Sequence, residues 1–101
     1  MSLKKQYLKS KPLCKVTFSL PKDVAPKAKK VTLVGEFNEW NTAALPMKKL
    51  KDGSFKVTCD LSVGSEYQFR YLIDGKTWEN DWSADKYVYN GLSEDNSVVI
   101  L

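Results

Sequence analysis

The sequence predicts an all-β fold, an immunoglobulin-like antiparallel β-sandwich of about seven strands. Apolar residues recur at every second position in several short segments, and no window of helical length shows a sustained apolar stripe at positions i, i+3, i+4 and i+7. Two Asp-Gly pairs, at residues 52–53 and 74–75, separate strand-like segments and are typical of hairpin turns. A length of 101 residues fits one domain. We expect residues 1–11 to be a basic N-terminal extension and residues 12–101 to form the sandwich.

The first half of the chain supplies three of the expected strands. Residues 14–20 alternate apolar and polar side chains and end at Pro21. The lysine-rich residues 22–30 are expected to form an exposed connection to a second strand at residues 31–35. A short third strand at residues 47–50 leads into the first Asp-Gly turn.

The second half of the chain supplies the remaining strands. Residues 55–61 return from the first turn, and in residues 67–73 four apolar side chains share one face. The second Asp-Gly turn leads to a return arm that holds Trp78. Residues 82–90 are interpreted as a polar loop, and residues 97–101 as the closing strand. Short antiparallel strands at this spacing are typical of a sandwich.

The two cysteines are expected to be free thiols in the core. Cys14 and Cys59 each lie in phase with apolar neighbours in an alternating segment. Two cysteines cannot make a disulfide framework, and their spacing is not that of a metal site. A single disulfide between them stays possible if the two strands face each other.

The formal net charge of +4 conceals two oppositely charged halves. Residues 1–59 hold 13 Lys against 4 acidic residues, whereas residues 60–101 hold 3 basic residues against 8 acidic ones. The lysine-rich half leaves open a polyanion-binding function. A nucleic-acid ligand is disfavoured, because Trp78 and Trp82 lie in the acidic half and not beside the lysines.

Neither a membrane segment nor a secretory signal is predicted. No segment approaches the roughly 20 apolar residues that span a bilayer, and the lysine-rich N-terminus has no apolar run. We therefore expect a cytoplasmic protein.

The residues required for catalysis or for metal binding are poorly represented. The chain has no histidine, and neither cysteine has an activating base in its sequence surroundings. Glu79 and Asp81 are interpreted as solvating a loop and not as a glycosidase pair. The acidic residues at 74, 79, 81 and 85 lack the ligand spacing of a calcium loop. We expect no enzyme activity, no metal and no cofactor.

Each of the three tryptophans stands among polar residues. Trp40 lies in NEWN, Trp78 in KTWEN and Trp82 in DWS. A flat indole can cover the apolar C–H face of a sugar ring while polar neighbours bond its hydroxyls, although Trp also caps the ends of a core when one edge stays wet. Arg70 alternates with the apolar residues of its strand, so it is expected to point outward from the sheet.

The order of four segments resembles the family-48 carbohydrate-binding modules: VTLVGEFNEWN, PMKKLKDGSF, YQFRYLIDGKTW and NGLSEDNSVVIL. This family includes the glycogen-binding domain of the AMP-activated protein kinase β subunit and the N-terminal early-set domains of isoamylases and glycogen branching enzymes. The resemblance spans residues 12–101. It implies an immunoglobulin-like sandwich and an α-1,4-linked glucan, such as glycogen or starch, as the ligand.

The resemblance also implies roles for individual residues. Trp40 and Trp78 match the two stacking tryptophans of the kinase domains, with one extra residue inserted before the second. Arg70 matches the strand lysine that hydrogen-bonds sugar hydroxyls.

The last of the four segments supplies further implied contacts. Leu92 matches the apolar residue that inserts against the curved glucan, and Asn96 matches the amide. Glu94 stands where the kinase-type domains have a threonine. We assign Glu94 and Trp82 accessory roles.

The main alternative is a protein-interaction or scaffold domain. In that case the chain docks on a glycan-metabolising enzyme or a regulatory complex and does not bind sugar, and a protein covers its tryptophans.

Overall fold

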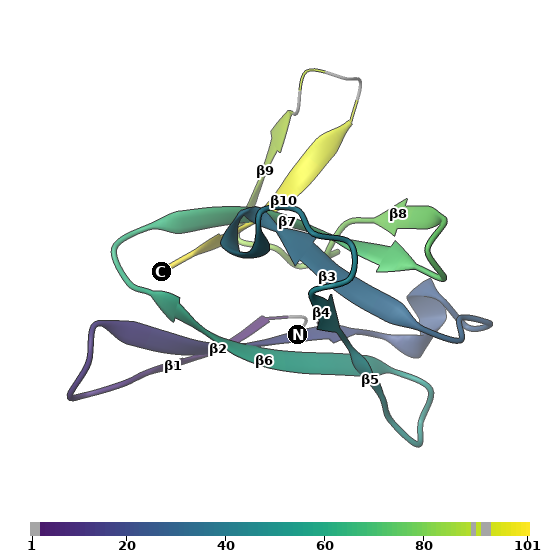
Figure 1. Ribbon diagram of the computed structural model, residues 1–101, viewed down its shortest axis with the longest axis horizontal. Coiled ribbons are helices and arrows are strands. Elements are labelled where there is room, and N and C mark those ends of the chain that lie inside the picture. Colours follow the sequence, from purple (N-terminus) through teal and green to yellow (C-terminus); the bar gives the residue numbers. More distant parts are fainter. Residues whose placement is uncertain (1–2, 90, 92–93) are drawn as a thin grey trace.

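The computed structural model describes residues 3–89, 91 and 94–101, which form two antiparallel sheets packed face to face (Figure 1). One sheet has the strand order β1-β2-β6-β5, and the other has the order β4-β3-β7-β10-β9, with β8 also paired to β7. The strands are β1 (Leu3–Tyr7), β2 (Leu13–Leu20), β3 (Val31–Gly35), β4 (Leu45–Pro46), β5 (Lys48–Lys49), β6 (Phe55–Ser62), β7 (Glu66–Ile73), β8 (Thr77–Glu79), β9 (Lys86–Tyr89) and β10 (Asp95–Ile100). Two short 3-10 helices, η1 (Lys22–Val24) and η2 (Glu36–Asn38), lie in the connections. The all-β sandwich predicted from the sequence is confirmed.

The core lies between β2 and β6 of one sheet and β3 and β7 of the other. Alternation along these strands turns every second side chain inward, as the sequence pattern predicted. Phe18, Phe69 and Tyr71 are fully buried. Phe69 lies edge-on to both neighbours, with ring centroids 5.0 Å from Phe18 and 5.7 Å from Tyr71, an arrangement that aromatic pairs favour. The contact between Phe18 of β2 and Phe69 of β7 joins the two sheets.

Both cysteines are free thiols, as expected from the sequence. Cys14 is fully buried, whereas Cys59 is only half-buried. Their strands are adjacent in one sheet and do not face each other, because Val16 pairs directly with Cys59. Burial, and to a smaller extent the neighbouring Asp60 carboxylate, raises the pKa of the Cys59 thiol to about 11.

Two strands lie where the sequence pattern indicated none. β1 is an edge strand of three polar and two apolar or aromatic residues, and it pairs with β2 from Leu3 opposite Phe18 to Tyr7 opposite Cys14. The Lys5 ammonium also forms an ion pair, at 2.7 Å, with the carboxylate of Asp85, which lies in the loop before β9 of the other sheet. Lysines on an edge strand discourage pairing with another chain, and they also mask the alternation that identifies a strand.

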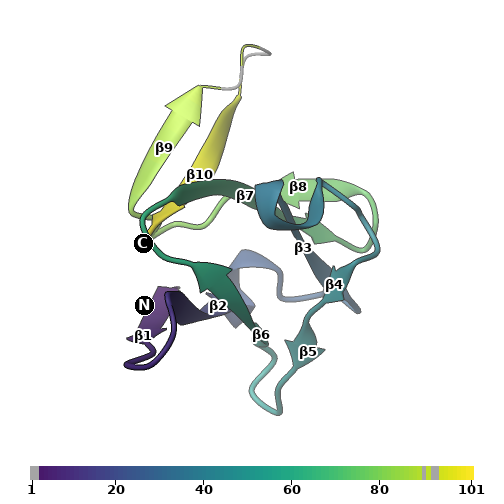
Figure 2. The same cartoon turned by 60° about the vertical axis from the view of Figure 1, so that its left-hand side comes forward.

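The interpretation of residues 82–90 as a loop is wrong for Lys86–Tyr89, which form β9. β9 pairs with β10, so that Tyr87 lies opposite Ser97 and Tyr89 opposite Asp95. Both tyrosines remain largely exposed, so β9 has no buried face to produce an alternating pattern. Figures 1 and 2 agree that β9 and the beginning of β10 project beyond the body of the two sheets.

The predicted strand at residues 47–50 is only partly formed, because β5 covers Lys48–Lys49 and β4, at Leu45–Pro46, precedes it in the other sheet. β4 pairs with β3, whereas β5 pairs with β6. Between them the backbone N–H of Met47 donates to the Val31 carbonyl at 2.8 Å, and the Met47 side chain is buried. The chain therefore crosses from one sheet to the other at Met47.

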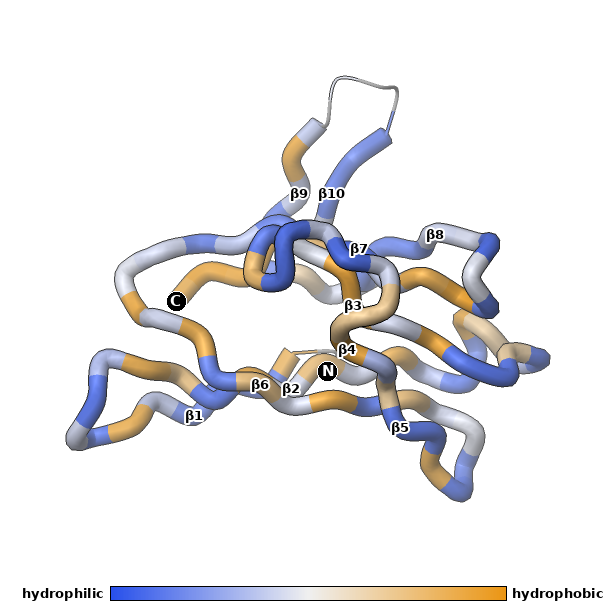
Figure 3. The backbone as a smooth tube through the Cα atoms, viewed as in Figure 1, coloured by the Kyte–Doolittle hydropathy of each residue, from blue (hydrophilic) through white to orange (hydrophobic). Residues whose placement is uncertain are grey.

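Both Asp-Gly turns join hairpins, as predicted. Gly53 lies between β5 and β6 with a φ of 91°, and in the β7–β8 turn Asp74 and Gly75 have φ values of 51° and 68°. Figure 3 shows hydrophilic residues in this turn and hydrophobic residues within β3, the strand beside it. No helix among the described residues has the length and apolar character needed to cross a membrane.

Candidate functional site

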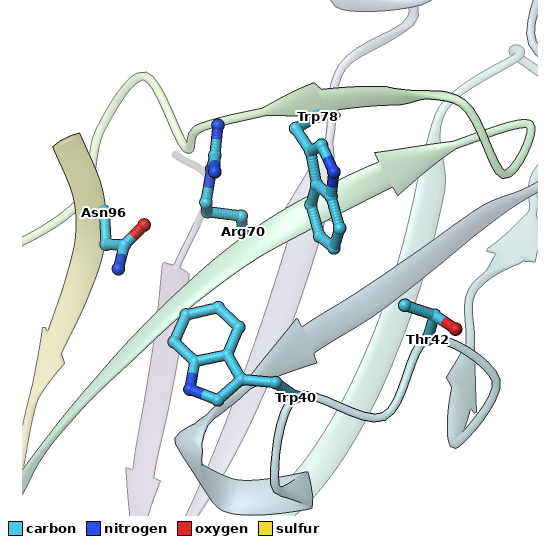
Figure 4. A pocket seen from close by; sticks show the side chains of 5 residues that line it. All are labelled: Trp40, Thr42, Arg70, Trp78 and Asn96. Carbon is cyan, nitrogen blue, oxygen red and sulfur yellow. The ribbon is translucent and has the colours of Figure 1, made fainter. Parts of the chain in front are cut away.

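One pocket, of about 400 Å³, lies on the outer face of the sheet that contains β7. Its lining residues come from distant parts of the sequence: Trp40, Thr42, Arg70, Trp78 and Asn96. In Figure 4 the two indoles flank the pocket, with the Arg70 and Asn96 side chains on one side and Thr42 on the other. The sheet thus gathers two flat aromatic surfaces, a cation, an amide and a hydroxyl group.

Trp40 is positioned by a sharp turn that follows β3. Glu39 and Trp40 both have a left-handed backbone, with φ values of 56° and 58°. The Trp40 N–H donates to the Gly35 carbonyl at 2.8 Å. The Asn38 side chain bridges the turn, because its oxygen accepts from the Gly35 N–H and its amide donates to the Leu33 carbonyl. These bonds hold the indole over the sheet.

Gly35 allows this turn to lie close to β7. A Cβ atom at this position would lie 2.6 Å from the Gln68 carbonyl oxygen and 2.8 Å from the Phe69 Cβ. Both contacts are shorter than packed atoms tolerate, and neither belongs to the end of a flexible side chain. Only glycine fits here without a shift of one strand.

Trp78 is positioned by the β7–β8 hairpin. It pairs directly with Leu72, so its side chain lies on the same face of the sheet as Arg70. The turn is fixed by Asp74, whose carboxylate accepts from the backbone N–H groups of Lys29 and Lys30, both at 2.9 Å. These two hydrogen bonds lower the pKa of the Asp74 carboxyl group from its ordinary value.

Arg70 is the sole arginine of the chain and the charged residue that lines the pocket. Its guanidinium carbon lies 5.4 Å from the centroid of the Trp78 ring, within the range of a cation–π contact. One terminal nitrogen forms an ion pair with the Glu94 carboxylate. The Nε atom is buried and has no hydrogen-bond partner among the described residues.

The Asn96 amide completes the polar side of the pocket. Asn96 is 7% exposed, and its amide nitrogen donates to the Gln68 side-chain oxygen at 3.0 Å. An amide group has two N–H donors and one acceptor oxygen. The hydrogen bond to Gln68 uses one of the two donors and fixes the orientation of the Asn96 amide.

A buried polar network behind the pocket holds the loop after β8. Asp81 is 1% exposed and accepts from the Tyr71 hydroxyl at 2.7 Å, while its own N–H donates to the Ser97 hydroxyl. The Asn80 side-chain oxygen accepts from both the N–H and the hydroxyl of Ser97. Burial first, and Asp81 second, raise the pKa of Tyr71 well above its usual range. The expectation that Asp81 solvates a loop is therefore wrong, because its carboxylate is buried and accepts hydrogen bonds from the Tyr71 hydroxyl and the Ser83 N–H.

The other acidic residues of this region are separated from one another. Asp74 bonds backbone N–H groups of residues 29 and 30, and Asp85 pairs with Lys5. Among residues 3–89, 91 and 94–101, no three carboxylate, cysteine or histidine side chains gather where they would hold a metal ion.

The structure brings together four of the site residues named from the sequence, Trp40, Arg70, Trp78 and Asn96. Glu94 contacts this group through Arg70. Trp82 does not line the pocket, and it is 63% exposed against 38% for Trp40 and 39% for Trp78. Leu92 lies outside the described residues.

Thr42 lines the pocket but was missed in the sequence, where it follows a polar turn and carries no distinguishing pattern.

The pocket as a whole suits a ligand with both an apolar face and hydroxyl groups. Indole rings cover apolar surface, while the guanidinium, amide and hydroxyl groups exchange hydrogen bonds. Sugars have both kinds of surface.

A family described as "Carbohydrate-binding module 48 (Isoamylase N-terminal domain)" matches residues 15–89 of the chain. The chain belongs to this family. It is therefore a carbohydrate-binding module, and the resemblance noted in the sequence is confirmed. The match includes Trp40, Arg70 and Trp78 and ends before Asn96.

Two curated relatives are bacterial enzymes. The chain is 41% identical over 62 residues to the "1,4-alpha-glucan branching enzyme GlgB" of Aquifex aeolicus, a match that covers 58% of this chain and 10% of that enzyme. It is 41% identical over 67 residues to the protein of the same name from Photobacterium profundum, a match that covers 65% of this chain and 9% of that enzyme. The chain thus spans about a tenth of the length of these relatives.

Proposed function

We propose that this carbohydrate-binding module binds α-1,4-glucan chains of the glycogen or starch type and does not catalyse a reaction on them. The observation that carries the proposal is that Trp40 and Trp78, each more than a third exposed, line one pocket together with Arg70 and Asn96. The names of the two relatives support the choice of glucan, because both are 1,4-alpha-glucan branching enzymes.

In this proposal each side chain has a distinct role. The indoles of Trp40 and Trp78 stack on the apolar faces of glucose units, while Arg70 and Asn96 bond hydroxyl groups. The family resemblance alone assigns Leu92 a contact with the curved glucan. Glycosidic bond cleavage uses two carboxyl groups that flank the bond. Among the described residues, the side chains lining the pocket include no carboxylate.

The expected affinity is weak. Two indole faces that each remove about 60 Å² of apolar surface from water contribute roughly 3 kcal/mol. Hydrogen bonds add about 1 kcal/mol each, and the ordering of ligand and side chains subtracts from the total. We expect a Kd between about 10 µM and 1 mM.

A pair of calorimetric titrations tests the proposal. Maltoheptaose, an α-1,4 oligomer of glucose, is expected to bind with a Kd between about 10 µM and 1 mM. Cellohexaose, a β-1,4 oligomer of the same sugar, is expected to bind far more weakly. The absence of binding at millimolar maltoheptaose, or equal binding of the two oligomers, would overturn it.

Docking on a protein is the second candidate function. Its support is that the chain matches only about a tenth of each branching enzyme, so in those proteins the matching segment is joined to a much longer polypeptide. The partner class proposed is a glycan-metabolising enzyme. If the chain captures such an enzyme from a lysate and excess glycogen does not displace the enzyme, docking is supported. Release of the enzyme by glycogen supports glucan binding instead.

A further inference from the structure

We infer that Glu94 makes the pocket selective for neutral glucans by excluding carbohydrates that carry anionic groups, such as phosphate, sulfate or carboxylate. The inference rests on the proposed glucan function of the same pocket. It assigns a specificity-determining role to the Arg70–Glu94 ion pair.

The first observation is the state of the Arg70 guanidinium. Its side chain is 14% exposed, stacks against Trp78 and has a buried Nε without a partner among the described residues. A planar guanidinium presents its donors in a fork that fits two oxygens of a phosphate or carboxylate group. By itself, an arginine held in this way on a pocket wall would attract anions.

The second observation is the position of Glu94. Its side chain is 56% exposed, and its carboxylate pairs with a terminal nitrogen of Arg70. Because Arg70 is the charged side chain that lines the pocket, this ion pair makes the local charge neutral. An anionic group that approaches the guanidinium must therefore also approach a carboxylate.

A neutral sugar can contact the same ion pair without being repelled by the Glu94 carboxylate. One hydroxyl group accepts a hydrogen bond from a nitrogen of Arg70 and donates its own hydrogen to the Glu94 carboxylate. An ionised sulfate ester or a fully ionised phosphate ester has no hydrogen of its own to donate, and its charge is repelled at short range in the partly desolvated pocket. The ion pair thus favours hydroxyl groups over anions.

The test compares maltoheptaose with maltoheptaose sulfated on every glucose unit, so that an anionic group meets Arg70 in any register. The measured quantity is the ratio of the two Kd values, sulfated over neutral, in the wild type and in Glu94→Gln. Glutamine keeps a hydrogen-bond acceptor for Arg70 and removes the charge. Glu39→Gln is the matched control, because it removes one negative charge beside Trp40 without touching Arg70.

We expect the wild type to have a ratio of about ten or more, and Glu94→Gln to lower it at least about tenfold because the Kd of the sulfated oligomer falls. The Kd of maltoheptaose is expected to rise modestly, because a neutral amide oxygen accepts the sugar hydroxyl hydrogen more weakly than a carboxylate does. Glu39→Gln is expected to change the ratio by less than about threefold. A ratio near unity in the wild type, or an equal effect of the two substitutions, overturns the inference but leaves the proposed function intact. If the wild type does not bind maltoheptaose, the proposed function fails, and the inference fails with it.

Discussion

The surroundings of the three tryptophans differ enough to separate their contributions. Trp40 and Trp78 line the pocket, whereas Trp82 is the most exposed and lies outside it. We expect Trp40→Ala and Trp78→Ala each to raise the Kd of maltoheptaose about tenfold, because each indole face contributes roughly 1.5 kcal/mol. Trp82→Ala is the control and is expected to leave the Kd unchanged. Calorimetry measures all three, and equal losses in the three variants would contradict the assignment.

The half-buried Cys59 gives a prediction that is independent of any ligand. Its thiol has a pKa of about 11 against an ordinary value of 9.0, and only the thiolate reacts with iodoacetamide. At pH 8 we expect Cys59 to react about a hundredfold more slowly than in the unfolded chain, with the rate rising as the pH approaches 11. Mass spectrometry of timed samples measures the rate. Equal rates in the folded and unfolded chains would contradict the burial of this thiol.

Sequence reasoning identified the site residues whose chemistry is distinctive in its context. Trp40 and Trp78 stand out among polar neighbours, and Arg70 is the sole arginine. Thr42 and Asp81 could not be found in this way, because in the sequence a threonine in a turn and an aspartate beside other acids have the pattern of ordinary surface residues. The burial of Asp81 depends on the Tyr71 hydroxyl, which only the folded sheets bring to it.

At the scale of elements, the close approach of β3 to β7 determines where the Trp40 turn lies. In Gly35→Ala the added Cβ would meet the Gln68 carbonyl oxygen at 2.6 Å, so one strand must shift. We expect a loss of about 1–3 kcal/mol in the free energy of unfolding, measured by urea denaturation, together with weaker maltoheptaose binding.

Gly64→Ala serves as the comparison for this substitution. Gly64 has open space around it and a φ of 80°, so alanine there has only a backbone cost of about 1 kcal/mol. If Gly35→Ala were as stable as the wild type, the close approach of the two strands would be refuted.

The β7–β8 turn gives a prediction about pH. Because the folded pKa of Asp74 is lowered, its stabilising contribution is full above the unfolded pKa near 3.8 and is lost as the pH falls through the folded value. Asp74→Asn keeps the side-chain oxygen but does not titrate. We expect this variant to be less stable than the wild type at pH 7 and to approach it near pH 2, as measured by thermal unfolding.

Asp23→Asn is the control for this measurement, because the Asp23 carboxylate makes no such backbone hydrogen bonds in the part of the chain that the structure describes. It is expected to follow the wild-type pH dependence. Stability curves of Asp74→Asn and the wild type that stay parallel from pH 7 to pH 2 would show that Asp74 does not fix the turn.

Most of the strands that the sequence predicted carry buried side chains, whereas the predicted strand β8 is largely exposed. β2, β3, β6 and β7 carry alternating or continuous apolar residues, and both Asp-Gly turns have the positive φ values that their residues favour. β1 and β9 are edge strands whose side chains are largely exposed, so neither has the period that sequence reasoning relies on. The change of sheet at Met47 depends on tertiary packing and has no local signal.

At the scale of the whole molecule, the charge asymmetry of the sequence becomes an asymmetry between the two sheets. The outward-facing positions of the sheet that contains β1, β2, β5 and β6 hold Lys4, Lys15, Lys48 and Lys56 against Asp60. The pocket lies on the outer face of the other sheet, where Arg70 is neutralised by Glu94. The basic surface and the pocket are therefore separate, and the proposed glucan site does not include these lysines.

The central claim is that one face of the sandwich binds glucan through Trp40 and Trp78. The chain has three indole N–H groups and one arginine, so each gives an assignable signal in a ¹H–¹⁵N NMR spectrum. On titration with maltoheptaose we predict that the indole signals of Trp40 and Trp78 and the Nε–H signal of Arg70 shift together, while the indole signal of Trp82 stays in place. Shifts confined to Trp82, or no shift of the pocket signals at millimolar ligand, would contradict the claim.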